Sequence, residues 1–225
     1  MNIETTLSEG IKILKQFKIP NPQLDSEILL SNSIKKDKKH IILNPKELLN
    51  SEQAKKFQNL IERRKKGEPV AYLINIKEFW KYSFFVNSNV LIPRPDTELI
   101  IEQVIKIYSK DSNLQVLDIG TGSGCILLSI LKERPNFYGT GIDISKKSIN
   151  VSKLNAKQLN LSSRVKFFNS SVDNFKIGKY DLIVSNPPYI ELLSLKYLEK
   201  DVVNFEPKLA LSGGLDGFSK IRKVI

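Results

Sequence analysis

The sequence contains one cysteine, Cys125, and one histidine, His40, among its 225 residues. A single cysteine excludes an internal disulfide framework, and neither residue has enough companions to build a zinc site. No stretch approaches the roughly 20 apolar residues of a membrane span, and the opening segment MNIETTLSEG lacks the apolar core of a signal peptide. We therefore expect a cytoplasmic protein with no bound metal and no membrane contact.

Acidic residues are fewer than basic ones: 24 Asp and Glu against 35 Lys and Arg give a net charge of +11. Such a balance favours a polyanionic neighbourhood such as RNA or the ribosome. The lysines are spread along the chain rather than gathered in one stripe, so a codon bias toward Lys, Asn and Ile explains them equally well. Charge alone names no partner; contact with nucleic acid or the ribosome stays open, and we expect a monomer.

Residues 1–69 carry helical signals. Asn21-Pro22 and Asn44-Pro45 each place an N-cap residue before a proline suited to the first helical position. Ser51 is placed to cap a further helix, which Gly67 and the following proline would close. Apolar side chains recur at helical spacing before these signals, at Leu7, Ile11, Leu14 and Phe17. The sequence predicts a small all-helical domain.

Residues 70–95 change to aromatic and β-branched runs, with turn residues at 87–89. This pattern predicts a β-hairpin linker. Thr97 is then placed to cap a helix that runs to about Tyr108.

Residues 96–225 alternate strands with helices. Short apolar runs at 116–119, 138–143, 165–168 and 181–185 predict four strands. Helices are expected after the glycine-rich turn, to about Lys132, and from a Ser145 cap to about Asn160. This alternation predicts an α/β domain with a parallel, doubly wound sheet and ligands at the carboxyl ends of its strands.

A glycine-rich turn joins the first of these strands to a helix. Glycines there let backbone N–H groups approach a ligand closely, although a plain tight turn would look the same. The spacing is G-x-G-x-G, and Cys125 stands where the dinucleotide fingerprint needs its third glycine, which disfavours hydride chemistry. The turn consists of Gly120, Thr121, Gly122, Ser123 and Gly124.

Asp143 ends the second strand about 20 residues further on, where a carboxylate can accept hydrogen bonds from both hydroxyls of a ribose. Ser145 is available as the helix cap, so Asp143 is not needed for that role. The arrangement suits an adenosine that carries a cationic sulfonium, which is S-adenosylmethionine. Asp118, beside the turn, either adds negative potential for that cation or only braces the turn.

The segment Asn186-Pro187-Pro188-Tyr189 directly follows the fourth strand. Two prolines could merely end a strand. An amide nitrogen, however, is a poor nucleophile that must be held in line with the methyl donor. The Asn186 side-chain oxygen and the Pro187 carbonyl can each accept one N–H of an NH2 group. Pro188 would stiffen this corner and Tyr189 would offer a ring face to the planar amide, so catalysis would rest on positioning and electrostatics without a general base.

The same tetrapeptide occurs in methyltransferases that act on DNA adenine or RNA guanine, so it indicates the reaction better than the substrate. Two further blocks of sequence indicate which substrate class applies. Residues 92–98, IPRPDTE, resemble the segment that precedes the catalytic domain of release factor glutamine methyltransferases. Residues 206–217, EPKLALSGGLDG, are similar to a later block of that family. The resemblance covers nearly the whole chain.

The resemblance implies a Rossmann-like class I methyltransferase sheet, S-adenosylmethionine as cofactor, and class I peptide chain release factors as partners. The substrate would be the glutamine of their Gly-Gly-Gln loop and the product N5-methylglutamine. It also implies that the helical domain recognises the substrate and that Arg94 braces the hairpin. The turn residues, Asp143 and Asn186 would bind the cofactor. A nucleic-acid amino-methyltransferase and an inactive fragment remain as alternatives.

The chain departs from the family pattern at several positions. Asn75 and Lys81 stand where the family has glycines, and Ser171 stands where it has an aspartate near the adenine. Contact with adenine is therefore expected from Val172, with Asp173 as the alternative. The family sheet has seven strands and we predict four, which leaves residues 181–185 with an unpaired edge. A split gene, a decayed gene or a longer native chain would each explain this.

Overall fold

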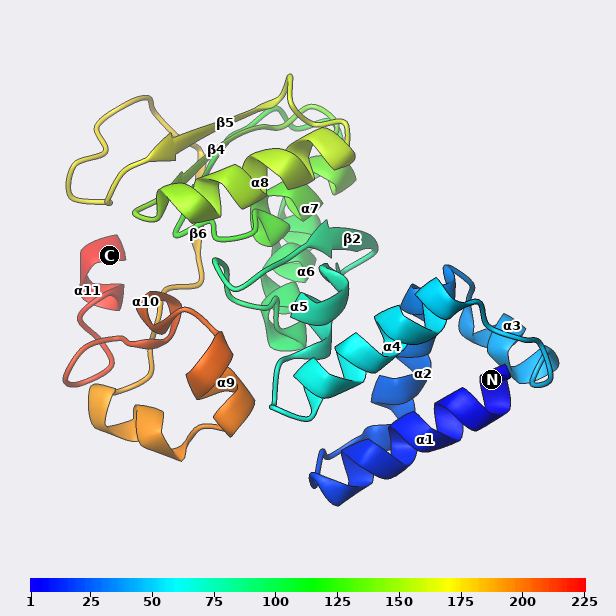
Figure 1. Cartoon of the computed structure of the whole chain (residues 1–225). Helices are drawn as coiled ribbons and strands as arrows, with labels where there is room; N and C mark the ends of the chain where they lie inside the picture. Colours follow the sequence, from blue (N-terminus) through cyan, green and yellow to red (C-terminus); the bar gives the residue numbers. More distant parts are fainter. The chain divides into compact units, whose positions relative to one another are not determined.

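The computed structural model describes all residues, 1–225, and the chain divides into two compact units, Met1–Asn75 and Ile76–Ile225 (Figure 1). Each unit has its own group of buried apolar side chains. None of the helices combines the length and the apolar composition that crossing a membrane requires.

The first unit is entirely helical, as the sequence predicts. It contains a buried ion pair: the Arg64 Nε atom lies 2.7 Å from Asp25 Oδ2, and both residues are buried. Largest among its fully buried side chains are Ile3, Leu14, Leu29, Leu30 and Ile61. The helices are α1 (Ile3–Gln16), α2 (Pro22–Ile34), α3 (Lys38–Leu43), α4 (Ser51–Arg64) and α5 (Val70–Ile74).

Two expected helix starts in this unit are wrong. Asn44 ends α3 instead of beginning a helix, and its side-chain nitrogen donates to the His40 carbonyl at 3.0 Å. Asn50, not Ser51, caps α4: its side chain accepts from the Gln53 N–H, while the Gln53 side chain accepts from the Asn50 N–H. This reciprocal pair satisfies two N–H groups at once, which a serine one position later could not do.

The hairpin is shorter than predicted and belongs to the second unit. Residues 70–74 form α5, which ends at Asn75 in the left-handed conformation that asparagine tolerates. The hairpin itself pairs β1 (Ile76–Phe79) with β2 (Tyr82–Phe85), and residues 86–94 form no strand. Trp80, not Lys81, takes the positive φ of its turn, +57°.

The Glu133 carboxylate anchors this hairpin turn. Its Oε1 atom accepts from the Trp80 indole N–H, the Lys81 ammonium and the Tyr82 hydroxyl, each at 3.0 Å. Burial raises the pKa of Glu133, but these donors outweigh it and hold that pKa below its usual value. A bulky residue at positive φ is strained, and these contacts offset the strain.

The sheet of the second unit has four parallel strands in the order β5-β4-β3-β6. The four predicted strands are confirmed, and the predicted segment 138–143 coincides with β4. Strand β6 pairs only with β3, and Ile183 on it is 54% exposed. The strands are β3 (Gln115–Ile119), β4 (Tyr138–Asp143), β5 (Val165–Asn169) and β6 (Leu182–Ser185).

Helices and irregular segments cover the two faces of this sheet. Val116 belongs to the core that α6 (Glu98–Ile107) and α7 (Cys125–Glu133) share with the hairpin. Leu117 and Ile119 point to the other face and pack with Ile142 against the partly buried Val172, Val224 and aromatic rings of the loop after β5. This alternation along β3 follows from the period of two in a strand.

The chain after β6 folds back toward the sheet. It passes through the short helices η2 (Leu192–Tyr197), α9 (Lys200–Phe205), α10 (Lys208–Leu211) and α11 (Ile221–Val224). Ile190 and Ser212 form a parallel bridge, so the segment that directly follows β6 is paired with the segment after α10.

Asn155 on α8 (Lys146–Gln158) is fully buried and joins the hairpin to the glycine-rich turn. Its side-chain oxygen accepts from the Phe85 N–H at 2.7 Å, and its nitrogen donates to the carbonyls of Phe85 and Ser123 at 3.0 and 2.8 Å. One buried amide thereby makes three hydrogen bonds, all of them to backbone groups.

We predict that Asn155→Ala lowers the free energy of unfolding by about 2–4 kcal/mol, because it leaves buried backbone groups without partners. Urea unfolding measures this. Asn150→Ala, an exposed position on the same helix, is the matched control and should change the unfolding free energy little. Equal effects of both substitutions would contradict the role of Asn155.

Candidate active site

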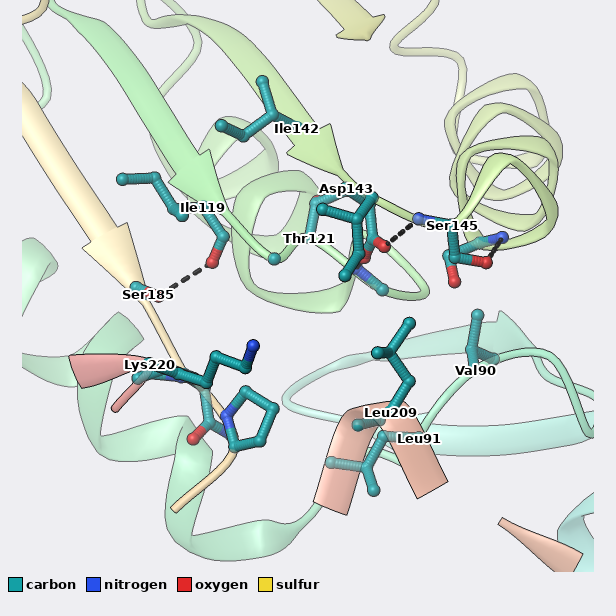
Figure 2. A pocket seen from close by; sticks show the side chains of 18 of the residues that line it. Val90, Leu91, Ile119, Thr121, Ile142, Asp143, Ser145, Ser185, Leu209 and Lys220 are labelled. Carbon is teal, nitrogen blue, oxygen red and sulfur yellow. Dashed lines mark hydrogen bonds between the residues drawn. The ribbon is translucent and has the colours of Figure 1, made fainter. Parts of the chain in front are cut away.

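One cavity of about 380 Å³ lies at the carboxyl ends of β3, β4 and β6. Figure 2 shows Ile119, Asp143 and Ser185 at these strand ends, with Leu91 and Leu209 across the cavity from them. Its volume falls in the range of small-molecule sites, about 300–1,000 Å³. The carboxyl end of a parallel sheet is also where such folds bind ligands.

The glycine-rich turn forms one wall of this cavity. A Cβ atom on Gly120 would meet nothing within 4 Å, and one on Gly122 would meet only the Gly120 carbonyl, at 3.9 Å. Both residues have positive φ, +75° and +55°, so glycine is favoured there for conformation and the backbone is open to a ligand. Thr121 and Ser123 line the cavity as well.

Gly124 differs from the other two glycines of the turn. It does not line the cavity. A Cβ atom there would lie 3.0 Å from Leu128 Cδ1 and 3.2 Å from Ser152 Cβ, so this glycine allows close packing beneath the turn. The structure therefore does not place Gly124 with the other predicted cofactor-binding residues.

Asp143 lines the cavity and is held by the backbone. Its Oδ2 atom accepts from the Gly122 N–H at 3.0 Å, and its Oδ1 atom accepts from the Ser145 N–H at 2.8 Å (Figure 2). Burial raises the pKa of this carboxyl, although both N–H groups lower it. Each carboxylate oxygen keeps a further lone pair, so two ribose hydroxyls can still donate to Asp143.

Asp118 lies under the turn and is completely buried. Its Oδ2 atom accepts from the Thr121 hydroxyl at 2.7 Å, whereas its Oδ1 atom has no hydrogen-bond partner. Burial raises the pKa of Asp118 to about 7; the Thr121 hydroxyl lowers it, and the nearby Asp143 carboxylate raises it again. Asp118 thus braces the turn and does not itself line the cavity.

Val172 and Asp173 both line the cavity, and their surroundings distinguish them. The Asp173 carboxylate forms an ion pair with the Lys223 ammonium. Val172 packs against the cluster of Leu117, Ile119 and Ile142 and presents an apolar surface. An apolar surface suits the face of an adenine, whereas Asp173 already has a partner.

The corner after β6 forms another wall. Asn186, Pro187 and Pro188 line the cavity, but Tyr189 does not, and its side chain is 65% exposed. The structure thus brings together the predicted Asn-Pro-Pro residues and leaves the tyrosine ring outside. The Asn186 side-chain nitrogen donates to the Thr97 hydroxyl at 3.1 Å.

Glycines from residues 213–217 press against this corner. A Cβ atom on Gly213 would lie 2.8 Å from the Pro188 carbonyl oxygen, and one on Gly217 would lie 2.6 Å from the Tyr189 carbonyl oxygen. The Gly213 N–H donates to the Ile190 carbonyl at 2.8 Å. Larger residues at these glycines would push the corner out of place.

Glu206, the first residue of the block 206–217, contacts the cavity wall at Arg94 and Ile92. Its side chain is 1% exposed; it pairs with the Arg94 guanidinium at 2.5 Å and accepts from the Ile92 N–H at 3.2 Å. The resemblance implied that Arg94 braces the hairpin, but the sequence did not predict Glu206 as the partner of Arg94. Thr97 and Asn155 were likewise missed as contributors to the site; their contacts link residues far apart in the chain.

Comparison with known proteins identifies the family of the chain. The family described as PrmC N-terminal domain matches residues 5–74, and the methyltransferase small domain matches residues 95–203. A release factor glutamine methyltransferase of Buchnera aphidicola subsp. Baizongia pistaciae is 43% identical and is matched over 96% of this chain and 76% of its own length. That of Caulobacter vibrioides is 38% identical over 94% of this chain and 73% of its own length.

The chain belongs to the release factor glutamine methyltransferase family. Relatives of another architecture also match: a bifunctional methyltransferase of Rickettsia bellii is 36% identical over 96% of this chain, which spans only 44% of that relative. The chain therefore spans less than half of the bifunctional relatives and about three quarters of the release factor glutamine methyltransferases.

The fold of the chain is similar to that of a solved methyltransferase structure. The hMettl16 catalytic domain, crystallised with a MAT2A 3'UTR hairpin, superposes with a TM-score of 0.51 over 62% of this chain and 54% of its own. The two are 19% identical, so the similarity concerns the fold. Residues of the family's glycine-rich turn and Asp143 fit S-adenosylmethionine, because an open backbone and a carboxylate with free lone pairs face one cavity.

We predict that the raised pKa of Asp118 makes stability depend on pH. The folded state holds the Asp118 proton up to about pH 7, whereas the unfolded chain releases it near pH 4, so this contribution to stability falls as the pH rises between these values. The expected loss is on the order of 1.4 kcal/mol per pH unit within that window.

Chemical unfolding of the wild type and of Asp118→Asn at pH 5 and pH 8 tests this. All other titrating groups are shared, so the difference between the two proteins isolates Asp118. The wild type should lose stability relative to the variant as the pH rises; a difference that stays constant from pH 5 to pH 8 would refute the assignment.

Proposed function

We propose that this chain transfers a methyl group from S-adenosylmethionine to the side-chain amide nitrogen of a glutamine in peptide chain release factors. The observation that carries the proposal is that one cavity is lined both by the open glycines with Asp143 and by the Asn-Pro-Pro corner. A methyl donor and a carboxamide held at these two walls would lie within reach of each other.

The cofactor half of the site uses backbone and one carboxylate. S-adenosylmethionine supplies an electrophilic methyl group on a positively charged sulfur. Asp143 accepts the ribose hydroxyls, since its oxygens have lone pairs beyond those used by Gly122 and Ser145. Gly120 and Gly122 let the backbone approach, and Val172 packs against the adenine.

The acceptor half of the site presents oxygens. Asn186 directs its side-chain nitrogen at Thr97, which leaves the side-chain oxygen to accept an N–H of the glutamine amide. The Pro187 carbonyl accepts the second N–H. Both oxygens stabilise the positive charge that develops on the nitrogen as it attacks the methyl group, and Pro188 stiffens the backbone that holds them.

The partner is assigned through the family. The relatives at 38–43% identity are named release factor glutamine methyltransferases, and the motif resemblance points to the glutamine of the Gly-Gly-Gln loop in class I release factors. The helical unit, Met1–Asn75, is where we place recognition of the release factor. We place the reaction in the cytoplasm, where translation ends.

We predict that the chain labels a class I release factor when it is incubated with S-adenosylmethionine carrying an isotopic methyl group. Mass spectrometry should place the label on the Gly-Gly-Gln glutamine. The control is a release factor with that glutamine changed to alanine, which should remain unlabelled. Label on duplex DNA or RNA instead would favour a nucleic-acid methyltransferase, and absence of cofactor binding by calorimetry would favour an inactive fragment.

Two substitutions should separate the halves of the site. Asp143→Asn removes charged acceptors from the ribose hydroxyls and should weaken S-adenosylmethionine binding about tenfold or more, because hydrogen bonds to charged groups are the stronger class. Asn186→Ala should leave cofactor affinity within a few-fold and lower turnover by about 100-fold, since it removes positioning of the acceptor.

Calorimetry gives the cofactor affinity and single-turnover kinetics gives the transfer rate. Thermal unfolding checks that both variants are folded. The same loss of affinity and rate in both variants would mean that the two walls do not have separate roles.

A further inference from the structure

Thr97 has a hydroxyl that the local structure does not use. The residue is the last of η1 (Pro95–Thr97) and directly precedes α6, where a threonine normally caps the helix through its side chain. In the structure Thr97 has helical dihedral angles, φ −70° and ψ −17°, and makes no side-chain capping hydrogen bond. The expected cap is therefore wrong, and the hydroxyl is available for another partner.

That partner is the side-chain amide of Asn186, 89 residues further along the chain. The Asn186 nitrogen donates to Thr97 Oγ1 at 3.1 Å, and both residues line the cavity. A carboxamide presents either an oxygen that accepts or a nitrogen that donates, depending on its rotation by 180°. In the structure the Thr97 hydroxyl is the acceptor of this hydrogen bond, which holds the Asn186 nitrogen and leaves the side-chain oxygen on the other side of the carboxamide.

The backbone at Thr97 is itself held in place. The Thr97 N–H donates to the Arg94 carbonyl at 3.1 Å, and the Arg94 side chain is paired with the buried Glu206 carboxylate. Pro95 fixes the first position of η1. The hydroxyl therefore sits on a constrained turn, which is what an orienting group requires.

We propose that Thr97 is a positioning residue that sets the orientation of the Asn186 carboxamide and so selects an acceptor that donates two N–H groups. Without the hydroxyl, the Asn186 amide can rotate and direct its own N–H groups at the NH2 group of the substrate amide, where two donors would face each other. The inference rests on the proposed function, since it assigns the origin of amide selectivity at the same site.

Thr97→Val removes the hydroxyl and keeps the shape, and Thr97→Ser keeps the hydroxyl. We expect Thr97→Val to lower kcat for the release factor by about tenfold, the effect of one lost hydrogen bond that orients a group, with S-adenosylmethionine affinity and Tm close to the wild type. Thr97→Ser should restore most of the rate. Ser163→Ala, which removes an exposed hydroxyl in the second unit outside the cavity, is the control and should have no effect.

A second measurement does not depend on activity. The side-chain NH2 signals of Asn186, assigned in 15N-labelled protein by their loss in Asn186→Ala, should shift in Thr97→Val and stay near the wild-type position in Thr97→Ser. Unchanged signals in Thr97→Val, or a Thr97→Ser rate as low as that of Thr97→Val, would overturn the proposal. If the wild type labels no release factor, the proposed function fails, while the NMR comparison still decides whether Thr97 orients Asn186.

Discussion

The Glu206 carboxylate, with a side chain that is 1% exposed, joins two segments separated by more than 100 residues. A buried carboxylate is costly unless it is paired and hydrogen-bonded, and here Arg94 and the Ile92 N–H meet both needs. Arg94 belongs to the turn that carries Thr97, and Glu206 precedes the segment that carries Gly213. This one interaction therefore holds two walls of the cavity in fixed positions relative to each other. Removing Arg94 alone would leave the buried Glu206 carboxylate without its counter-ion.

Close backbone contact extends this arrangement to the corner after β6. The carbonyl oxygens of Pro188 and Tyr189 lie only 2.8 and 2.6 Å from where Cβ atoms of Gly213 and Gly217 would be. The corner follows an edge strand that pairs only with β3, so the sheet constrains it on one side. The hydrogen bonds between residues 190–192 and 211–214 supply the constraint on the other side. The two prolines then limit what backbone freedom remains.

Sequence predicted the sheet well because buried parallel strands read as short apolar runs, and β4 matches its predicted bounds. It also singled out Asp143 and Asn186, which follow directly from a strand end and a short motif. It failed where distant residues decide a local choice. Trp80 tolerates positive φ because Glu133, 53 residues away, receives its indole N–H, and Thr97 gives up capping for a partner on another segment.

Other misses came from choosing between competing local signals. Asn50 and Gln53 have the residue types and spacing of a capping box. Ser51 is also a common N-cap residue, but only Asn50 has Gln53 as a reciprocal partner. Gly124 and Tyr189 belong to the right motifs, but membership of a motif does not say which way a residue faces. Packing beneath the turn occupies Gly124, and the Tyr189 ring lies outside the cavity.

Charge pairing around the cavity explains why a basic chain has a binding site suited to a cationic ligand. The carboxylates of Glu206 and Asp173 are each neutralised by a basic side chain, Arg94 and Lys223. Asp143 is held instead by two neutral N–H groups, so its negative charge is not cancelled. The Asp143 carboxylate lies close enough to Asp118 to raise the pKa of Asp118. A cation in the cavity would favour the ionised form of both carboxyls. Asp143 is thus a carboxylate without a basic partner at the glycine-rich turn, although Lys220 also lines the cavity and the whole chain carries a net charge of +11.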